Sequence, residues 1–116
     1  MKKVIHQSSI PEEIVDLDGA LGVKIQWLIN SSDDAENFFM RRFTVDVGGY
    51  TPRHSHPYEH EVYVLEGKGK VFIDGEWHDF EKDFVIFVPP DSEHQFKNTG
   101  DTELIFLCSI PAKPSA

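Results

Sequence analysis

The sequence is poor in cysteine, in basic residues and in long apolar runs. Cys108 is the single cysteine among 116 residues, which excludes an intrachain disulfide. Lysine and arginine number 11 against 20 acidic residues, and the net charge of −9 argues against sequence-independent binding to nucleic acid or to an anionic membrane. The uncharged apolar stretches are also far shorter than a membrane span. We therefore expect a protein that partners neither nucleic acid nor membrane.

Two further absences bear on location and on domain number. The basic start, residues 1–5, is followed by polar residues and not by the apolar region of a signal peptide, so we expect a cytoplasmic protein. No internal repeat, low-complexity tract or interdomain linker divides the chain. A length of 116 residues suits one hydrophobic core, and we expect a single domain over residues 1–116.

Alternating apolar and polar residues predict short strands along most of the chain. We expect Gly48–Gly49 to end one strand, and Asp74–Gly75 to form the turn of a hairpin. Residues 11–15 fit either a short helical turn or a loop. Roughly eight to ten strands with little helix are typical of an all-β barrel or jelly roll. The strands are expected at residues 23–30, 38–47, 62–67, 70–73, 77–80, 84–88, 94–97 and 104–110.

Three histidines fall within seven residues. His54, His56 and His60 share one parity of an extended chain, so their rings can converge if the intervening Pro57–Tyr58 only bends the strand. His94 follows later, in a separate Pro-Pro-Asp-Ser-Glu-His stretch. Imidazole is a frequent ligand of zinc, copper, iron and nickel, and it binds as the neutral base. We predict that this four-histidine set (His54, His56, His60 and His94) holds one divalent metal ion, either catalytic with open positions or structural with four closed ones.

Several other side chains on the predicted inner faces are open to two interpretations. Arg41 shares the apolar parity of its strand, so it offers charge stabilisation to an anionic substrate or a bound oxygen species. The alternatives are that it pairs with a buried carboxylate or that its side chain extends out of the end of the barrel. Cys108 is either a small core residue or an oxidisable lining of the metal pocket. Glu59 and Glu61 are either partners of imidazole N–H groups or solvated. The barrel interior is expected to contain Trp27, Ile29, Phe39, Phe84, Phe96 and Phe106.

The stretch 48–67 resembles the first motif of the cupin family: a glycine, five residues, His-x-His, three or four residues, a glutamate, six residues and a glycine. Gly48 and Gly67 bound the stretch, and a His-x-His pair stands at the family spacing. In the register that Gly67 fixes, His60 takes the position of the usual glutamate. Glu61 points to the opposite face of the strand.

The stretch 83–98 resembles the second cupin motif: a glycine, five residues, Pro-x-Gly, two residues, a histidine, three residues and an asparagine. His94 and Asn98 stand at the family spacing. Asp83 and Asp91 replace the two motif glycines, and aspartate also adopts turn conformations. The two stretches and their flanking strands cover about two-thirds of the chain.

The resemblance implies a cupin jelly-roll β-barrel, and the neutral histidine ligands resemble those of the small four-histidine manganese cupins. That likeness implies a homodimer with Mn(II) or Fe(II) and oxygen- or peroxide-dependent chemistry on a small molecule. Ligand chemistry alone also admits Ni(II) or Zn(II). Outward-facing Tyr63 and Leu65 would suit the dimer interface.

Three functional hypotheses follow. The first is a metal-dependent, oxygenase-like enzyme in which Arg41 assists catalysis. The second is a non-enzymatic ligand-binding or regulatory cupin with a structural metal. The third is a non-redox isomerase or lyase, which needs a general base near the substrate. The sequence offers no inward-facing carboxylate or tyrosine for that role, which favours the first hypothesis.

Overall fold

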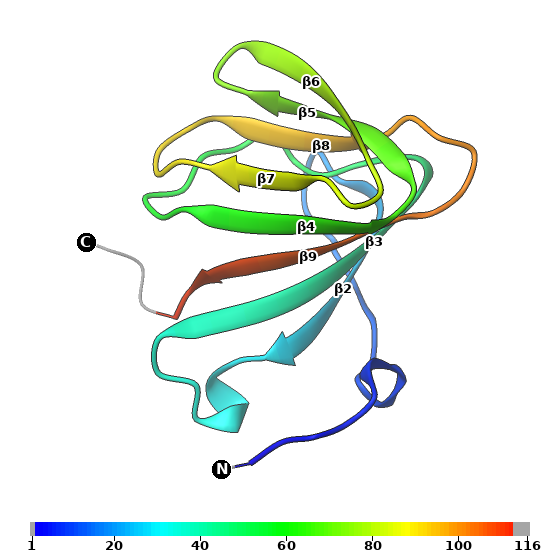
Figure 1. Ribbon diagram of the computed structural model, residues 1–116. Helices are drawn as coiled ribbons and strands as arrows, with labels where there is room; N and C mark the ends of the chain where they lie inside the picture. The colour runs from blue at the N-terminus through cyan, green and yellow to red at the C-terminus, as the bar shows by residue number, and fades with distance from the viewer. Residues whose placement is uncertain (1, 113–116) are drawn as a thin grey trace.

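The computed structural model of the chain describes residues 2–112, and strands are its main regular secondary structure (Figure 1). Two 3-10 turns, η1 (Gln7–Ser9) and η2 (Ser31–Asp33), precede β1 and follow β2. In the described range, no helix has the length and apolar character needed to cross a membrane. The predicted all-β class is confirmed. The strands within these residues are β1 (Glu13–Ile14), β2 (Leu21–Ile29), β3 (Phe38–Tyr50), β4 (His60–Glu66), β5 (Lys68–Ile73), β6 (Glu76–Glu81), β7 (Val85–Val88), β8 (His94–Asn98) and β9 (Leu104–Pro111).

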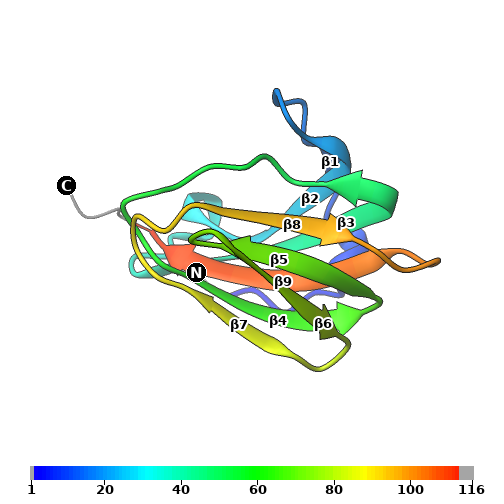
Figure 2. The ribbon, with the colours of Figure 1, turned by 90° about the horizontal axis from the view of Figure 1, so that it is seen from above.

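The strands form one antiparallel sheet in the order β6-β5-β8-β3-β9-β4-β7, with β2 paired to β3 and β1 to β2. The sheet is curled into a half-barrel. Seen from above, β8 lies on one side of the molecule and β4 and β7 lie on the other (Figure 2). The long strand β3 joins the two sides, because residues 38–45 pair with β9 while Tyr50 pairs with Lys97 of β8.

The interior is packed from both sides of the curled sheet. The ring of Phe106 stacks on that of Phe96 with centroids 4.9 Å apart and on that of Phe43 at 5.2 Å. Of the residues expected inside, Phe96 and Phe106 are buried, and Trp27 and Phe39 are partly buried. Burying such rings is the main source of stability in a domain of this size.

Two residues expected in the interior are exposed instead. Ile29 ends β2, and the register of β2 against β3 shifts between Trp27 and Ile29. The shift breaks the alternation, because one irregular step moves a side chain to the other face. Phe84 lies in the turn before β7, where the alternation of that strand has not begun.

The prediction that Gly48–Gly49 ends a strand is wrong, because β3 continues through both glycines to Tyr50. Gly48 has a φ of +79°, and the register of β2 against β3 is irregular in this region. A Cβ atom at Gly49 would lie 2.6 Å from the carbonyl oxygen of Leu21. The two glycines therefore let β3 bend and approach β2 closely, and the strand goes on to meet β8.

The N-terminal segment lies against β2, where one buried amide holds it. The Nε2 atom of Gln26 donates to the carbonyl oxygens of Gln7 and Ile10, both at 3.0 Å. The chain then forms β1, which pairs with β2. Residues 11–15 thus contribute a short strand, which neither of the two predicted conformations included. This strand brings the segment that follows it beside the interior of the sheet.

Besides Asp34 after η2, aspartate occupies the left-handed backbone region at three turns between strands. The φ angles are +47° at Asp74, +72° at Asp83 and +65° at Asp91. The first belongs to the predicted Asp74–Gly75 hairpin, which is confirmed by the pairing of β5 with β6 across it. The other two stand where the second cupin motif usually has glycine. Aspartate tolerates this conformation better than most residues, which explains why the motif spacing is intact.

Asp91→Gly is expected to leave the stability unchanged or to raise it by up to about 1 kcal/mol. Glycine removes the cost of a side chain at positive φ and adds the entropy cost of a freer unfolded chain. Asp91→Ala at the same position should destabilise the protein, because alanine has no polar side chain that favours the left-handed region. Urea unfolding of both variants tests this. A loss of more than about 1 kcal/mol in Asp91→Gly would mean that the carboxylate itself supports the turn.

Candidate metal centre

A cavity of about 360 Å³ lies on the inner side of the curled sheet and is lined by the whole four-histidine set. Its walls come from β2, β3, β4, β8 and β9, from the segment after β1 and from the loop between β3 and β4. Most of these walls are apolar. Examples of such lining residues are Val15, Leu17, Val23, Ile25, Trp27 and Phe43.

The backbones of the two motifs are joined at the cavity. The N–H of His54 donates to the carbonyl of His94 at 3.1 Å, and the N–H of His94 donates to the carbonyl of His54 at 2.9 Å. This isolated antiparallel bridge sets the two rings with centroids 4.8 Å apart. The N–H of Asp91 donates to the carbonyl of His56 at 2.7 Å, which fixes the second histidine of the first motif.

Three of the predicted ligands form a tight group. One ring nitrogen from each of His54, His56 and His94 lies within 4.8 Å of the others. His60, the first residue of β4, lies beside this group, and its ring centroid is 4.7 Å from that of His94 and 5.3 Å from that of His56. The structure therefore supports a three-histidine cluster that can bind a metal. The role of His60 as a fourth ligand stays a prediction.

One histidine already has the tautomer that a metal ligand requires. The Nδ1 atom of His94 lies 2.9 Å from the carbonyl oxygen of Ser92. A carbonyl can only accept, so Nδ1 carries the proton and Nε2 keeps its lone pair. Metal-binding histidines are usually oriented by such a bond from the other ring nitrogen.

The surroundings of the cluster keep the imidazoles neutral. Burial lowers the pKa of His54 to about 4 and that of His60 to about 3, and the charges of neighbouring rings and of Arg41 act in the same direction. Burial also lowers the pKa of His56 and His94. Neutral imidazole is the form that binds a metal. The donor set therefore fits a divalent ion in its chemistry as well as in its convergence.

Arg41 and Cys108 both lie in the wall of this cavity. They face each other across β3 and β9, and the Nη2 atom of Arg41 donates to the Sγ atom of Cys108 at 2.9 Å. Burial raises the pKa of the Cys108 thiol, so the sulfur is an uncharged acceptor. The alternative that Arg41 pairs with a buried carboxylate finds no support in the described residues, where it forms no ion pair.

Tyr58 also lines the cavity, and sequence reasoning missed it. Its ring stacks on that of His56 with centroids 4.9 Å apart and planes only 2° from parallel. The signal was present, because Tyr58 has the same strand parity as His54, His56 and His60. Its position next to a proline obscured that pattern. The cavity thus has a phenol that sequence analysis had excluded.

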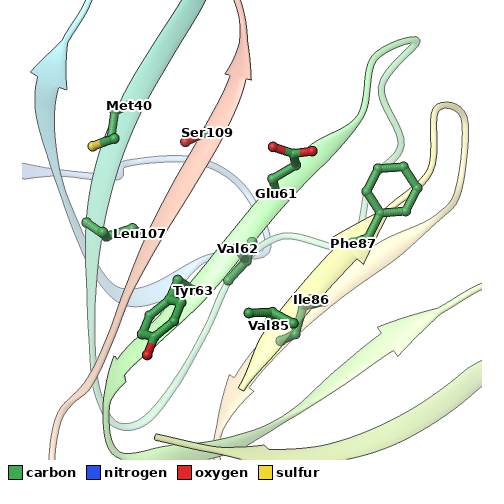
Figure 3. Close-up of a pocket in the computed structure, with 9 residues that line it drawn as sticks. All are labelled: Met40, Glu61, Val62, Tyr63, Val85, Ile86, Phe87, Leu107 and Ser109. Atoms are coloured by element: carbon green, nitrogen blue, oxygen red, sulfur yellow. The ribbon is translucent and has the colours of Figure 1, made fainter. Parts of the chain in front are cut away.

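Glu59 and Glu61 are both exposed, and neither lines the cavity. The buried Nδ1 atom of His60 has no hydrogen-bond partner in the described part of the chain, so neither carboxylate orients this ring. Glu61 instead lines a shallow hollow on the outer face of β4, β7 and β9, together with Tyr63 and Phe87 (Figure 3). This outer hollow contains none of the predicted metal ligands.

Comparison with known proteins agrees with the motifs. Residues 41–110 match the family described as "Cupin domain", which is more than half of the chain. The polyketide cyclase RemF from Streptomyces resistomycificus is 31% identical, with a TM-score of 0.91, and the match covers 100% of this chain and 83% of that one.

Two curated relatives match shorter regions. The "Polyketide synthase CurC" of Streptomyces cyaneus is 38% identical over 85 residues, or 70% of this chain and 55% of that protein. A glucose-6-phosphate isomerase of Pyrococcus abyssi is 43% identical over 65 residues, or 51% of this chain and 34% of the isomerase. The chain spans about half the length of the first curated relatives it matches, at 51–55%. The family match, the curled all-β sheet and the joined histidine motifs lead to one conclusion: the chain belongs to the cupin family.

Proposed function

We propose that this protein is a metal-dependent enzyme that acts on a small organic substrate inside the histidine-lined cavity. The observation that carries the proposal is the convergence of neutral imidazoles on a mostly apolar cavity. A purely structural metal needs no such space beside it. The volume of about 360 Å³ lies near the small end of the roughly 300–1,000 Å³ typical of ligand pockets, which favours a small substrate.

The metal proposed is Mn(II) or Fe(II), by likeness to the four-histidine cupins, with Ni(II) or Zn(II) as other ions that imidazole accepts. His54, His56 and His94 would hold it, with His60 as the fourth ligand. When bound, such an ion acts as a Lewis acid on a substrate oxygen and, if redox-active, supports oxygen chemistry. The chain supplies the apolar walls that exclude water and orient the substrate.

Two reaction classes fit the site. Oxygen- or peroxide-dependent chemistry follows from the likeness to manganese cupins. A non-redox reaction that moves a proton, such as an isomerisation or cyclisation, is favoured by Tyr58 in the cavity and by the similarity to a polyketide cyclase. Tyr58 removes the earlier objection to non-redox chemistry, since a phenol can donate or accept a proton. We therefore favour the non-redox class.

The first experiment measures the metal in protein purified without added metal, together with its electron paramagnetic resonance spectrum. We expect about one ion per chain, held by the histidines. Mn(II)-loaded protein should enhance the relaxation of water protons, because open positions let water exchange. Stoichiometric tetrahedral zinc with no exchangeable water would instead support a structural metal and a non-enzymatic, ligand-binding role. A chain that binds no divalent ion at all would contradict the proposal.

Tyr58→Phe separates the two reaction classes. The probe is benzoylacetone, a small β-dicarbonyl whose two oxygens can bind a divalent ion. In D2O we expect metal-loaded protein to exchange its α-hydrogens, read by NMR, and Tyr58→Phe to slow that exchange about 10²-fold or more with unchanged metal content. Oxygen uptake that is insensitive to Tyr58→Phe would favour the oxygenase class. If metal-loaded protein shows neither α-hydrogen exchange nor oxygen uptake, the enzymatic proposal is contradicted.

A homodimer is proposed on the outer hollow, where Tyr63, Val85 and Phe87 expose apolar surface on β4 and β7 (Figure 3). Tyr63 also donates a hydrogen bond from its hydroxyl to Asp83 at 3.0 Å, so its ring is already oriented. The proposed partners are this second copy and a small molecule, in the cytoplasm.

A further inference from the structure

Arg41 carries a positive charge, and the described residues give it no counter-ion. Its guanidinium lies 5.0 Å from the ring centroid of Phe43 and 5.7 Å from that of Trp27. These rings attract the cation but accept no conventional hydrogen bond. Water has limited access, because Arg41 is only partly exposed and its Nε atom is buried.

The hydrogen-bonding capacity of Arg41 is largely unused. A guanidinium offers five N–H donors. The side chain makes one hydrogen bond, from Nη2 to the thiol of Cys108 at 2.9 Å, and sulfur is a weak acceptor. The buried Nε atom has no partner among the described residues. A partly buried cation with unpaired N–H donors costs free energy unless an anion accepts hydrogen bonds from them.

The charges around the cavity do not balance. Among its described lining residues there is no aspartate or glutamate, and Arg41 is the one side chain that is charged at neutral pH. Neutral imidazoles leave the charge of a divalent ion uncompensated as well. A cavity with such an excess of positive charge attracts an anionic ligand.

We propose that Arg41 selects the substrate, and that this substrate carries a carboxylate on a small apolar body. The inference rests on the proposed function, since it takes this cavity as the substrate site. The planar guanidinium matches a carboxylate through two parallel hydrogen bonds. One guanidinium among apolar walls offers the two parallel donors that a carboxylate needs, whereas a phosphate usually meets more donors. Cys108 holds Arg41 toward the cavity and so acts as a positioning residue.

The test compares three probes by calorimetry on metal-loaded protein of known metal content: benzoate, its neutral isostere benzamide, and phenyl phosphate. We expect benzoate to bind at least about tenfold more tightly than benzamide. In Arg41→Met that preference should fall at least about tenfold, with benzamide affinity unchanged, and Arg41→Lys should recover only part of it. Arg53→Met is the matched control, because Arg53 is an exposed arginine stacked on Phe72 outside the cavity. It should bind like the wild type.

The other possible results separate the inference about Arg41 from the proposed function. Equal binding of benzoate and benzamide by the wild type would overturn the inference and leave the metal-dependent enzyme standing. A preference for phenyl phosphate over benzoate would overturn the carboxylate assignment. If Arg41→Met keeps the full preference, Arg41 is not the selecting residue. If the protein loads no metal yet prefers benzoate through Arg41, the proposed function fails and the inference holds. Unchanged benzamide binding in Arg41→Met shows that the variant is folded.

Discussion

His94→Ala is expected to lower metal affinity by more than about 100-fold, beyond the 10–100-fold that the loss of a supporting partner costs. His94 is buried, its Nε2 lone pair is free, and its backbone is bonded to that of His54. Its loss removes a ligand and leaves a hole in the cluster. Metal content after dialysis against a defined free-metal buffer measures the effect.

Thermal unfolding gives a second measure of the same change. An ion that binds only the folded protein stabilises it by about 2.7 kcal/mol at a free concentration 100 times its Kd. The wild type should therefore show a metal-dependent rise in Tm, and His94→Ala should show little or none at the same concentration. His94→Gln, which keeps more of the side-chain volume, distinguishes loss of a ligand from loss of packing.

The matched control is His78→Ala. His78 lies exposed on β6, where its Nε2 atom is 3.7 Å from the carboxylate of Glu76. Its removal should leave metal content and the metal-dependent rise in Tm unchanged. Full metal content in His94→Ala would show that the second motif does not supply a ligand and that our alignment of that motif is wrong.

Gly67→Ala is expected to destabilise the protein by about 3 kcal/mol or more. Gly67 closes the first motif with a φ of +87°, between β4 and β5. A Cβ atom there would lie 2.6 Å from the carbonyl oxygen of Glu103 and 3.0 Å from the Cα atom of Leu104. Both contacts are with backbone, which cannot rotate away as a side chain would. The start of β9 would have to move, and Leu104 is fully buried there.

Gly48→Ala isolates the contribution of that contact. Gly48 opens the same motif with a φ of +79°, but no atom lies within 4 Å of the Cβ position. Its substitution should cost only about 1 kcal/mol, from the left-handed backbone alone. Urea unfolding of both variants gives the difference. Equal losses would mean that the backbone angle, and not the approach of β9, explains why glycine is needed at Gly67.

Residues close together in sequence were the most predictable part of the site. The spacing of His54, His56 and His60 placed three rings on one side of the chain, because alternate residues of an extended segment face the same way. The Asp74–Gly75 hairpin was also predictable, since its turn type depends on two adjacent φ angles. The prediction that a strand ends at Gly48–Gly49 was wrong because it used local properties alone. Glycine permits a bend, but pairing with the neighbouring strands determines whether the strand ends there.

Apart from the approach of His94 to the first motif, contacts between distant segments were not predictable. The hydrogen bond from Arg41 to Cys108 depends on the register of β3 against β9, and alternation within each strand leaves that register open. The same holds for Val15, which reaches the cavity because β1 pairs with β2. Tyr58 had the right parity, but its role depends on the ring of His56 beside it.

The sequence by itself determined the all-β class, the two cupin motifs and the placing of His54 and His56 on one side of the chain, because strand alternation and turn chemistry are local properties. Only the tertiary structure decided that Arg41 bonds to a thiol and that Tyr58 lines the cavity. It also decided that no acidic side chain of residues 2–112 lines that cavity. These features arise where the curled sheet brings distant strands around one space. The chemistry of the cavity depends on which side chains face each other across it, and the register of strand pairing determines those contacts.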